Sequence, residues 1–353
     1  MDSTQDNPIA NTFGSGVTDV MVEQAIRSSG YPLQLIVAQA LSKDFSLTEE
    51  WSFVDAETGT ARTIDLVATR HLFEWKEPQP RVRPALNLVI ECKQSDLPYV
   101  FFLSGNCHWI PDFPIISGLK DKHIVLTSDD DPSSWTYRPL EVLGLNGHRF
   151  LTESVPFCMT FSKCVRKSSE LVLSGSDAYQ SLVFPILKAS QYFDKMQKPP
   201  STAFYFDCEI VIGLGILDAP MVGVRLTDSG TTTELLPWVR VVRHEPLEGH
   251  NRHDSSQLLG IDIVHKDYLG TYINQHVMPF ANEFSRLVLK HPDPLADAQG
   301  FVSGMGANSW TDIEPRLQRA TLRAGGKRGK AIIKNMLALL RNKNVEKNNS
   351  PTS

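Results

Sequence analysis

The pattern of apolar and polar positions in the first third of the chain predicts a hairpin followed by a long buried strand. Two runs, RTIDLVA at 62–68 and LNLVIECKQ at 86–94, are rich in β-branched and aliphatic residues. Runs of this length and composition are typical of buried strands. The turn-forming sequence DAETG at 55–59 precedes the first run and predicts a hairpin with an earlier strand at 51–54.

The rest of the chain alternates helical and strand patterns. The segment 31–42 places Leu33, Val37 and Leu41 at helical spacing, which predicts an amphipathic helix. The other predicted elements are helices at 18–29, 177–195 and 268–290, and strands at 123–127, 203–211, 215–226, 235–242 and 258–265. This alternation favours an α/β protein with one sheet flanked by helices.

Changes in composition and periodicity divide the chain into five parts. These are a disordered tail at 1–16, a core at 17–130, an irregular connection at 131–176, an α/β extension of the same sheet at 177–295, and a linker with a basic tail at 296–353. A short amphipathic helix is predicted within the tail, at 331–340.

Charged residues at the ends of the two apolar runs are the candidate chemistry. Side chains alternate along a strand, so Glu91 and Lys93 lie on one face of the predicted strand and Cys92 on the other. Charges that end such an apolar run are costly to bury without partners. Asp65 on a neighbouring strand and a divalent cation would provide those partners, because carboxylate oxygens are ligands that Mg²⁺ favours.

Three segments together resemble the PD-(D/E)xK, or restriction-endonuclease-like, nuclease superfamily, in particular a bacterial branch of it. They are GYPLQLIVAQAL at 30–41, WSFVDAETGTARTIDLVA at 51–68 and ECKQSDLPYVFF at 91–102. They resemble the first helix, the first hairpin, and the catalytic strand with its following turn, and cover about a fifth of the chain. FDCEIVIGLGILDAPMVGV at 206–224 is similar to a later strand pair of the same branch.

The resemblance implies a restriction-endonuclease-like mixed sheet flanked by helices, and metal-dependent hydrolysis of nucleic acid, DNA rather than RNA. Asp65, Glu91 and the backbone carbonyl of Cys92 would then ligate Mg²⁺, for which Mn²⁺ can substitute, and Lys93 would position the attacking water. Gln34 would contact a metal-bound water. The roles of other members of this superfamily suggest that the chain acts in defence or DNA repair.

The sequence departs from the family pattern at two positions, and other interpretations stay open. Family members often carry glutamate where this chain has Gln34 and Thr63. An inactive nucleic-acid-binding or scaffolding protein on the same fold is therefore one alternative. A nuclease gated by a ligand bound to the second half of the chain is another. Glu-x-Lys alone is also a common ion pair, and many unrelated hairpins fit the spacing between Asp65 and Glu91.

Charge is distributed unevenly, which bears on the choice of partner. The net charge is −5, but residues 316–347 hold ten Lys and Arg and one acid, so this segment is +9 and the rest is −14. Basic tails supply phosphate contacts, and the predicted ones are Lys327, Arg328, Lys330 and Lys334. The same tail could instead contact the acidic body of a neighbouring copy. One site per chain suggests a homodimer if both strands of a duplex are cut.

The sequence also suggests a compartment. Five scattered cysteines without a C-x-x-C pair fit reduced thiols, and the polar start MDSTQDNP is not a signal peptide. No apolar run approaches the ~18 residues that a membrane-spanning helix needs. A cytoplasmic protein without a membrane partner is expected.

Overall fold

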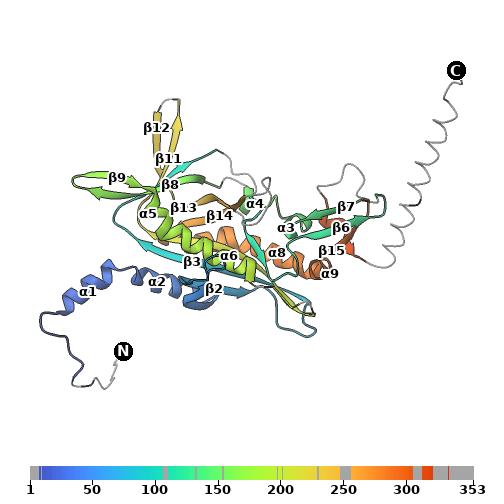
Figure 1. The fold of residues 1–353 in the computed structure, drawn as a ribbon, viewed down its shortest axis with the longest axis horizontal. Helices are drawn as coiled ribbons and strands as arrows, with labels where there is room; N and C mark the ends of the chain where they lie inside the picture. The colour runs from blue at the N-terminus through green and yellow to red at the C-terminus, as the bar shows by residue number, and fades with distance from the viewer. Residues whose placement is uncertain are drawn as a thin grey trace.

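The computed structural model is a mixed α/β protein built around one large sheet (Figure 1). It describes residues 8, 10–105, 110–131, 133–152, 155–196, 198–200, 202–228, 230–246, 256–304, 312–320 and 333. Within this part of the chain, twelve strands form the large sheet and four strands form a second, small sheet. Helices flank both faces of the large sheet.

The strands account for most of the regular structure. The large sheet contains β1 (Ser46–Val54), β2 (Ala61–His71), β3 (Val82–Gln94), β4 (Tyr99–Leu103), β5 (Ile115–Ser117), β8 (Phe157–Lys167), β9 (Glu170–Ser174), β10 (Phe206–Asp218), β11 (Met221–Thr227), β12 (Gly230–Leu235), β13 (Trp238–Pro246) and β14 (Ser256–His265). The small sheet contains β6 (Ile124–Ser128), β7 (Ser134–Tyr137), β15 (Gln299–Val302) and β16 (Leu317–Arg319).

The helices are mostly short. They are α1 (Asp19–Ser28), α2 (Tyr31–Leu41), α3 (Pro139–Val142), α4 (Arg149–Thr152), α5 (Gly175–Ala178), α6 (Phe184–Met196), α7 (Leu269–Tyr272), α8 (Met278–Lys290) and α9 (Pro292–Asp297). π-Helical turns at Tyr179–Val183 and Ile273–Val277 join α5 to α6 and α7 to α8, and 3₁₀ turns form at Lys266–Tyr268 and Glu314–Arg316. No described helix is long and apolar enough to cross a membrane.

Strand β3 lies inside the large sheet, between β2 and β10. It runs antiparallel to β2 and parallel to β10, in register from Val82 opposite Phe206 to Gln94 opposite Asp218. Its apolar stretch is buried on both faces, as expected for a strand covered on each side. The order of the sheet is β1-β2-β3-β10-β14-β13-β8-β4-β11-β12, with β5 also paired to β10 and β9 to β8.

Two hydrophobic clusters cover the two faces of β3. Leu88 and Ile90 belong to the first cluster, with residues of α2 and α8, whereas Val89 belongs to the second, with residues of α6. Two glycines of β10 permit the close approach of the helix on the second face. A Cβ on Gly213 would lie 2.5 Å from Ile186.

The bounds of two predicted strands are wrong. The sequence suggested β-rich segments at 203–211 and 215–226. The structure has one strand through both glycines, β10, followed by β11. The glycines do not end the strand. They allow the helical segment to pack closely on it, since a Cβ on Gly215 would lie 3.0 Å from Leu182.

The segments predicted as irregular differ most from the structure. Residues 131–176 contain β7, α3, α4 and the antiparallel pair of β8 and β9. Four of the five residues of β9 are exposed, so the strand lacks the alternation of buried and exposed positions that reveals a strand in sequence. In the predicted linker, β15 and β16 complete the small sheet with β6 and β7. The amphipathic helix predicted at 331–340 lies outside the described residues, apart from residue 333.

Candidate active site

The structure brings Asp65, Glu91 and Lys93 together at the carboxyl end of β3. The last residue pair of β2 and β3 in register is Leu66 with Ile90, so Asp65 lies just beyond it. One carboxylate oxygen of Asp65, Oδ2, accepts a hydrogen bond from the Cys92 backbone N–H at 2.7 Å. Residues far apart in sequence thus meet through a direct contact between neighbouring strands.

A tight hairpin turn holds the strand that carries Asp65. The buried Asp55 carboxylate accepts hydrogen bonds from the Glu57 N–H at 3.0 Å and from Arg62 Nε at 2.7 Å. Burial opposes ionisation of Asp55, but these donors lower its pKa to about 2. Gly59 takes the left-handed conformation that closes the turn, with φ of 67°. The predicted hairpin is therefore confirmed, with longer strands than the sequence suggested.

The backbone is irregular at Asp65 itself. The β1–β2 register pairs Glu49 with Leu66 and Trp51 with Ile64, and Glu50 between them has a positive φ of 48°. Ile64 belongs to the second hydrophobic cluster and Leu66 to the first, although residues two apart in a regular strand share a face. Such irregularities re-aim side chains. Here the change of direction occurs at Asp65.

Glu50 is a member of this neighbourhood that the sequence did not reveal. Its side chain is exposed on β1, and its negative charge contributes to raising the pKa of Asp65. The larger cause is burial of Asp65, which the N–H of Cys92 and the charge of Lys93 only partly offset. A charged residue in an exposed strand carries no sequence signal of this proximity.

Glu91 and Lys93 form an ion pair on one face of β3. Lys93 Nζ lies 2.6 Å from Glu91 Oε1, with side chains 31% and 8% exposed, respectively. Burial raises the pKa of Glu91 to about 7, although Lys93 acts in the opposite direction. Burial also works to lower the pKa of Lys93, but the nearby Glu91 charge raises it overall. With both carboxyls ionised, this group carries one more negative than positive charge.

Cys92 and Gln34 support the site from the other side of the strand. The Cys92 side chain belongs to the first hydrophobic cluster, so its thiol points away from Glu91, and burial raises its pKa. Gln34 is buried on α2, and its Nε2 donates a hydrogen bond to the backbone carbonyl of Asp65 at 2.9 Å. Gln34 thus holds the strand at Asp65 through the backbone. Thr63 is exposed, and its hydroxyl lies 3.3 Å from that of Ser52.

A groove of about 750 Å³ lies at the carboxyl ends of β3, β10 and β14. Its lining includes Gln94, Asp96, Asp218 and His265 over an apolar floor that includes Leu236. Ligands of α/β sheets commonly bind at the carboxyl ends of parallel strands. The groove begins one residue after Lys93.

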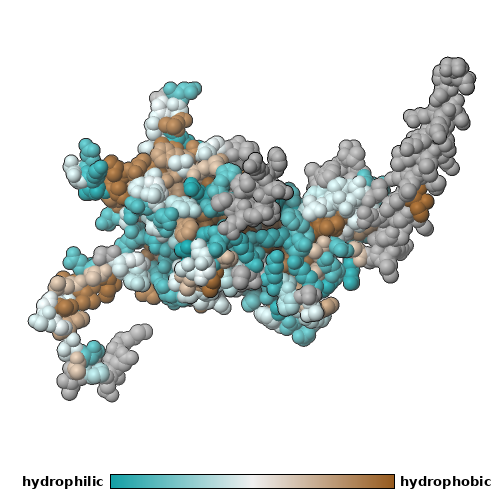
Figure 2. All heavy atoms as spheres, in the orientation of Figure 1, coloured by the Kyte–Doolittle hydropathy of each residue, from teal (hydrophilic) through white to brown (hydrophobic). Residues whose placement is uncertain are grey.

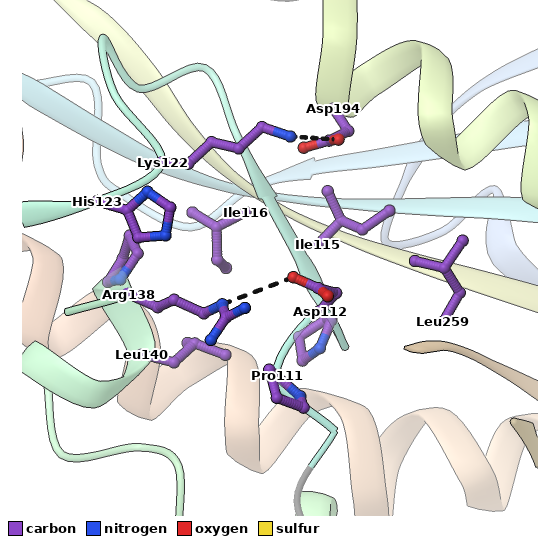
Figure 3. Close-up of a pocket in the computed structure, with 12 residues that line it drawn as sticks. Pro111, Asp112, Ile115, Ile116, Lys122, His123, Arg138, Leu140, Asp194 and Leu259 are labelled. Carbon is purple, nitrogen blue, oxygen red and sulfur yellow. Dashed lines mark hydrogen bonds and ion pairs between the residues drawn. The ribbon is translucent and has the colours of Figure 1, made fainter. Parts of the chain in front are cut away.

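A separate, smaller pocket of about 100 Å³ lies beside β5 (Figure 3). Two ion pairs border it: Lys122 Nζ lies 2.5 Å from Asp194 Oδ2, and Arg138 Nε lies 3.5 Å from Asp112 Oδ1. His123 also lines it, as do several apolar side chains. Burial raises the pKa of Asp112, although Arg138 opposes the change.

The last predicted site residues are those of the basic tail. Lys327, Arg328, Lys330 and Lys334 lie outside the described residues. Within the described residues, no group of three or more His, Cys, Asp and Glu side chains is arranged to hold a metal ion. Comparison with protein-family models, with curated proteins and with solved structures gave no match to this chain.

Proposed function

We propose that this chain is a Mg²⁺-dependent nuclease with a restriction-endonuclease-like fold, which hydrolyses phosphodiester bonds of nucleic acid, with DNA as the expected substrate. The observation that carries the proposal is the meeting of Asp65, Glu91 and Lys93 at the end of β3, through the Asp65–Cys92 and Glu91–Lys93 hydrogen bonds. The motif spacing alone did not require this contact.

The donor set suits a hard divalent cation. Glu91 is buried and Asp65 is half-buried, and Lys93 is paired with Glu91. Burial raises the pKa of Glu91, and the charge of Lys93 offsets this only in part. The N–H and C=O of one strand residue point to the same side, so the Cys92 carbonyl faces β2, as its N–H does. Asp65, Glu91 and this carbonyl would hold Mg²⁺, with water completing the coordination.

Each residue then has a defined role. A bound Mg²⁺ supplies Lewis-acid stabilisation of the charge that develops on the phosphate. Lys93, fixed by Glu91, donates a hydrogen bond to the attacking water and orients it. Attack occurs in line and leaves a 5′-phosphate. Gln34 keeps the backbone of Asp65 in place, so its lack of charge is compatible with this role.

Cleavage of supercoiled, linear and single-stranded DNA with Mg²⁺ or Mn²⁺ tests the proposal. We expect Lys93→Ala and Asp65→Asn to lower the cleavage rate by about 10²-fold or more, because each removes charge from the reacting centre. Asp207→Asn is the matched control, since Asp207 of β10 pairs with Arg83 at 2.9 Å, at the end of β3 opposite to the candidate site. Its rate should equal that of the wild type.

Two results would replace the proposal. DNA binding without cutting on any substrate and with either metal would favour the inactive nucleic-acid-binding protein. Equal cleavage rates for the wild type, Lys93→Ala and Asp65→Asn would show that the reaction occurs at another site. If both strands of a duplex are cut, one site per chain suggests that two copies act together, and sedimentation with and without DNA measures this.

A ligand-gated nuclease is the second candidate function. The pocket beside β5 is the observation that favours it (Figure 3). Asp194 and Leu259 of the second half of the chain line this pocket, together with residues of the first half such as Asp112 and Arg138. Cleavage that appears only after a small-molecule extract is added, and that Asp112→Asn abolishes, would support gating over a constitutive nuclease.

A further inference from the structure

Strands β8 and β9 form a two-stranded ribbon that projects from the end of the molecule where β3 carries the candidate site (Figure 1). Lys163 to Lys167 of β8 pair with Ser174 to Glu170 of β9. Only β8 borders β9, so the outer edge of β9 has no neighbouring strand among the described residues. The ribbon was not predicted from the sequence.

The ribbon is tied to the segment that follows Lys93. The Cys164 N–H donates a hydrogen bond to the Pro98 carbonyl at 2.8 Å, and Lys163 lies opposite Tyr99 in the antiparallel β4–β8 pair. Because β8 runs against β4, the residues after Cys164 extend back past Pro98, toward the turn that leaves Lys93. The tip of the ribbon therefore lies on the side of the site.

Three cations mark this ribbon. Arg166 and Lys167 are exposed, and Lys163 is half-buried with Nζ 5.7 Å from the centre of the Tyr99 ring. None of the three forms an ion pair with a described carboxylate, although Lys167 stands opposite Glu170 in the register. Most other described cations near the sheet are paired, such as Arg62 with Asp55. The ribbon is thus a site of uncompensated positive charge on an acidic body.

Aliphatic side chains accompany the cations. Leu171 and Leu173 of β9 are 53% and 50% exposed, and they lie on the same face of the ribbon as Arg166. Figure 2 shows hydrophobic surface at this projection. An exposed apolar edge strand is a surface on which another molecule can bind.

We propose that the β8–β9 ribbon binds the backbone of duplex DNA and holds it over the candidate site. The inference rests on the proposed nuclease function and deepens it by naming the surface that receives the substrate. A two-stranded ribbon fits the major groove, the three cations contact phosphates, and the aliphatic side chains contact sugars and base edges.

Salt-dependent DNA binding tests the ribbon separately from catalysis. Full-length protein is titrated with a short fluorescent duplex in EDTA, where no metal supports cutting, from about 50 to 200 mM salt. The variant Lys163→Ala/Arg166→Ala/Lys167→Ala should lower the slope of log affinity against log salt by about 2 to 3, at ~0.9 for each lost phosphate contact. Unchanged thermal melting establishes that the variant is folded.

The matched control removes the same charge elsewhere. Lys43→Ala/Lys120→Ala/Lys198→Ala changes three cations away from the site; Lys120 packs on Phe206 at the start of β10. Its salt slope should equal that of the wild type. A ribbon variant with the wild-type slope overturns the inference, even if the wild type cuts DNA. Failure of the wild-type protein to bind duplex DNA would also overturn it. So would a ribbon variant that loses only binding to anionic vesicles, or only self-association, and keeps wild-type DNA binding.

The two proposals fail in different ways. A reduced slope in the ribbon variant, with no cutting by the wild type in Mg²⁺, supports the ribbon and refutes hydrolysis. Cutting that depends on Lys93, with an unchanged slope in the ribbon variant, supports hydrolysis and refutes the ribbon.

Discussion

The buried carboxyl of Glu91 makes the stability of the metal-free protein depend on pH in a specific way. Burial raises its pKa from 4.5 to about 7, against the influence of Lys93. A carboxyl whose pKa is raised on folding stabilises the native state while it is protonated. Its contribution is complete below pH 4.5 and is lost as the pH rises through about 7.

The magnitude follows from the size of the shift. At about 1.4 kcal/mol per pKa unit, ionisation of Glu91 costs about 3 kcal/mol of folding free energy above pH 7. The side chain is only 8% exposed, so solvent screens little of this cost. The pKa of Asp65 is also raised by burial, which adds a cost of the same sign.

Urea unfolding followed by tryptophan fluorescence, in EDTA and at several pH values, measures the effect. We expect the unfolding free energy of wild type relative to Glu91→Gln to fall by about 2 to 3 kcal/mol between pH 5 and pH 8, because glutamine does not titrate. Glu49→Gln, which removes an exposed carboxylate of β1, controls for the loss of one charge. Parallel pH profiles for wild type and Glu91→Gln would refute the reasoning.

Three further outcomes are expected. Millimolar Mg²⁺ should raise the unfolding free energy of the wild type more at pH 8 than at pH 5, and calorimetry should detect proton release on binding, because the metal competes with the proton on Glu91. Arg240→Met should lower the free energy of unfolding in urea by about 3 to 5 kcal/mol, because Asp262, fully buried and 2.7 Å from Arg240 Nε, loses its counter-ion. The double variant Arg240→Met/Asp262→Leu should recover much of this loss. Equal destabilisation of the two variants would contradict the prediction. Gly213→Val should destabilise by about 1 to 3 kcal/mol through overpacking against Ile186, and a thermal melt unchanged from the wild type would contradict the close approach of α6.

The sequence was sufficient where local patterns carried the information. The runs containing Asp65 and Glu91 form strands as predicted, and period-two alternation correctly places Glu91 on one face and Cys92 on the other. The strands lie side by side because each is apolar enough to require burial. These features depend on neighbours within a few residues, which a sequence displays directly.

The other features depend on contacts that local patterns do not encode. The positive φ of Glu50 follows from the irregular pairing of β1 with β2. Glutamate is not a residue typical of turns, so the sequence does not indicate this conformation. Arg240 and Asp262 are charged yet fully buried, because each satisfies the other across β13 and β14. Strand β9 is exposed on both faces, so no hydrophobic periodicity marks it.

The charges of the site and of the ribbon together explain why substrate binding and metal binding should be coupled. In metal-free protein at a pH at which both carboxyls are ionised, Asp65 and Glu91 outnumber Lys93 and repel a phosphate, whereas Arg166 and Lys167 on the ribbon attract one. A divalent cation reverses the sign of the charge at the site alone. DNA held by the ribbon then gains a second favourable contact at the reacting phosphate. The affinity for a non-cleavable duplex should therefore rise when Ca²⁺ replaces EDTA, and this gain should disappear in Asp65→Asn while the salt slope due to the ribbon remains.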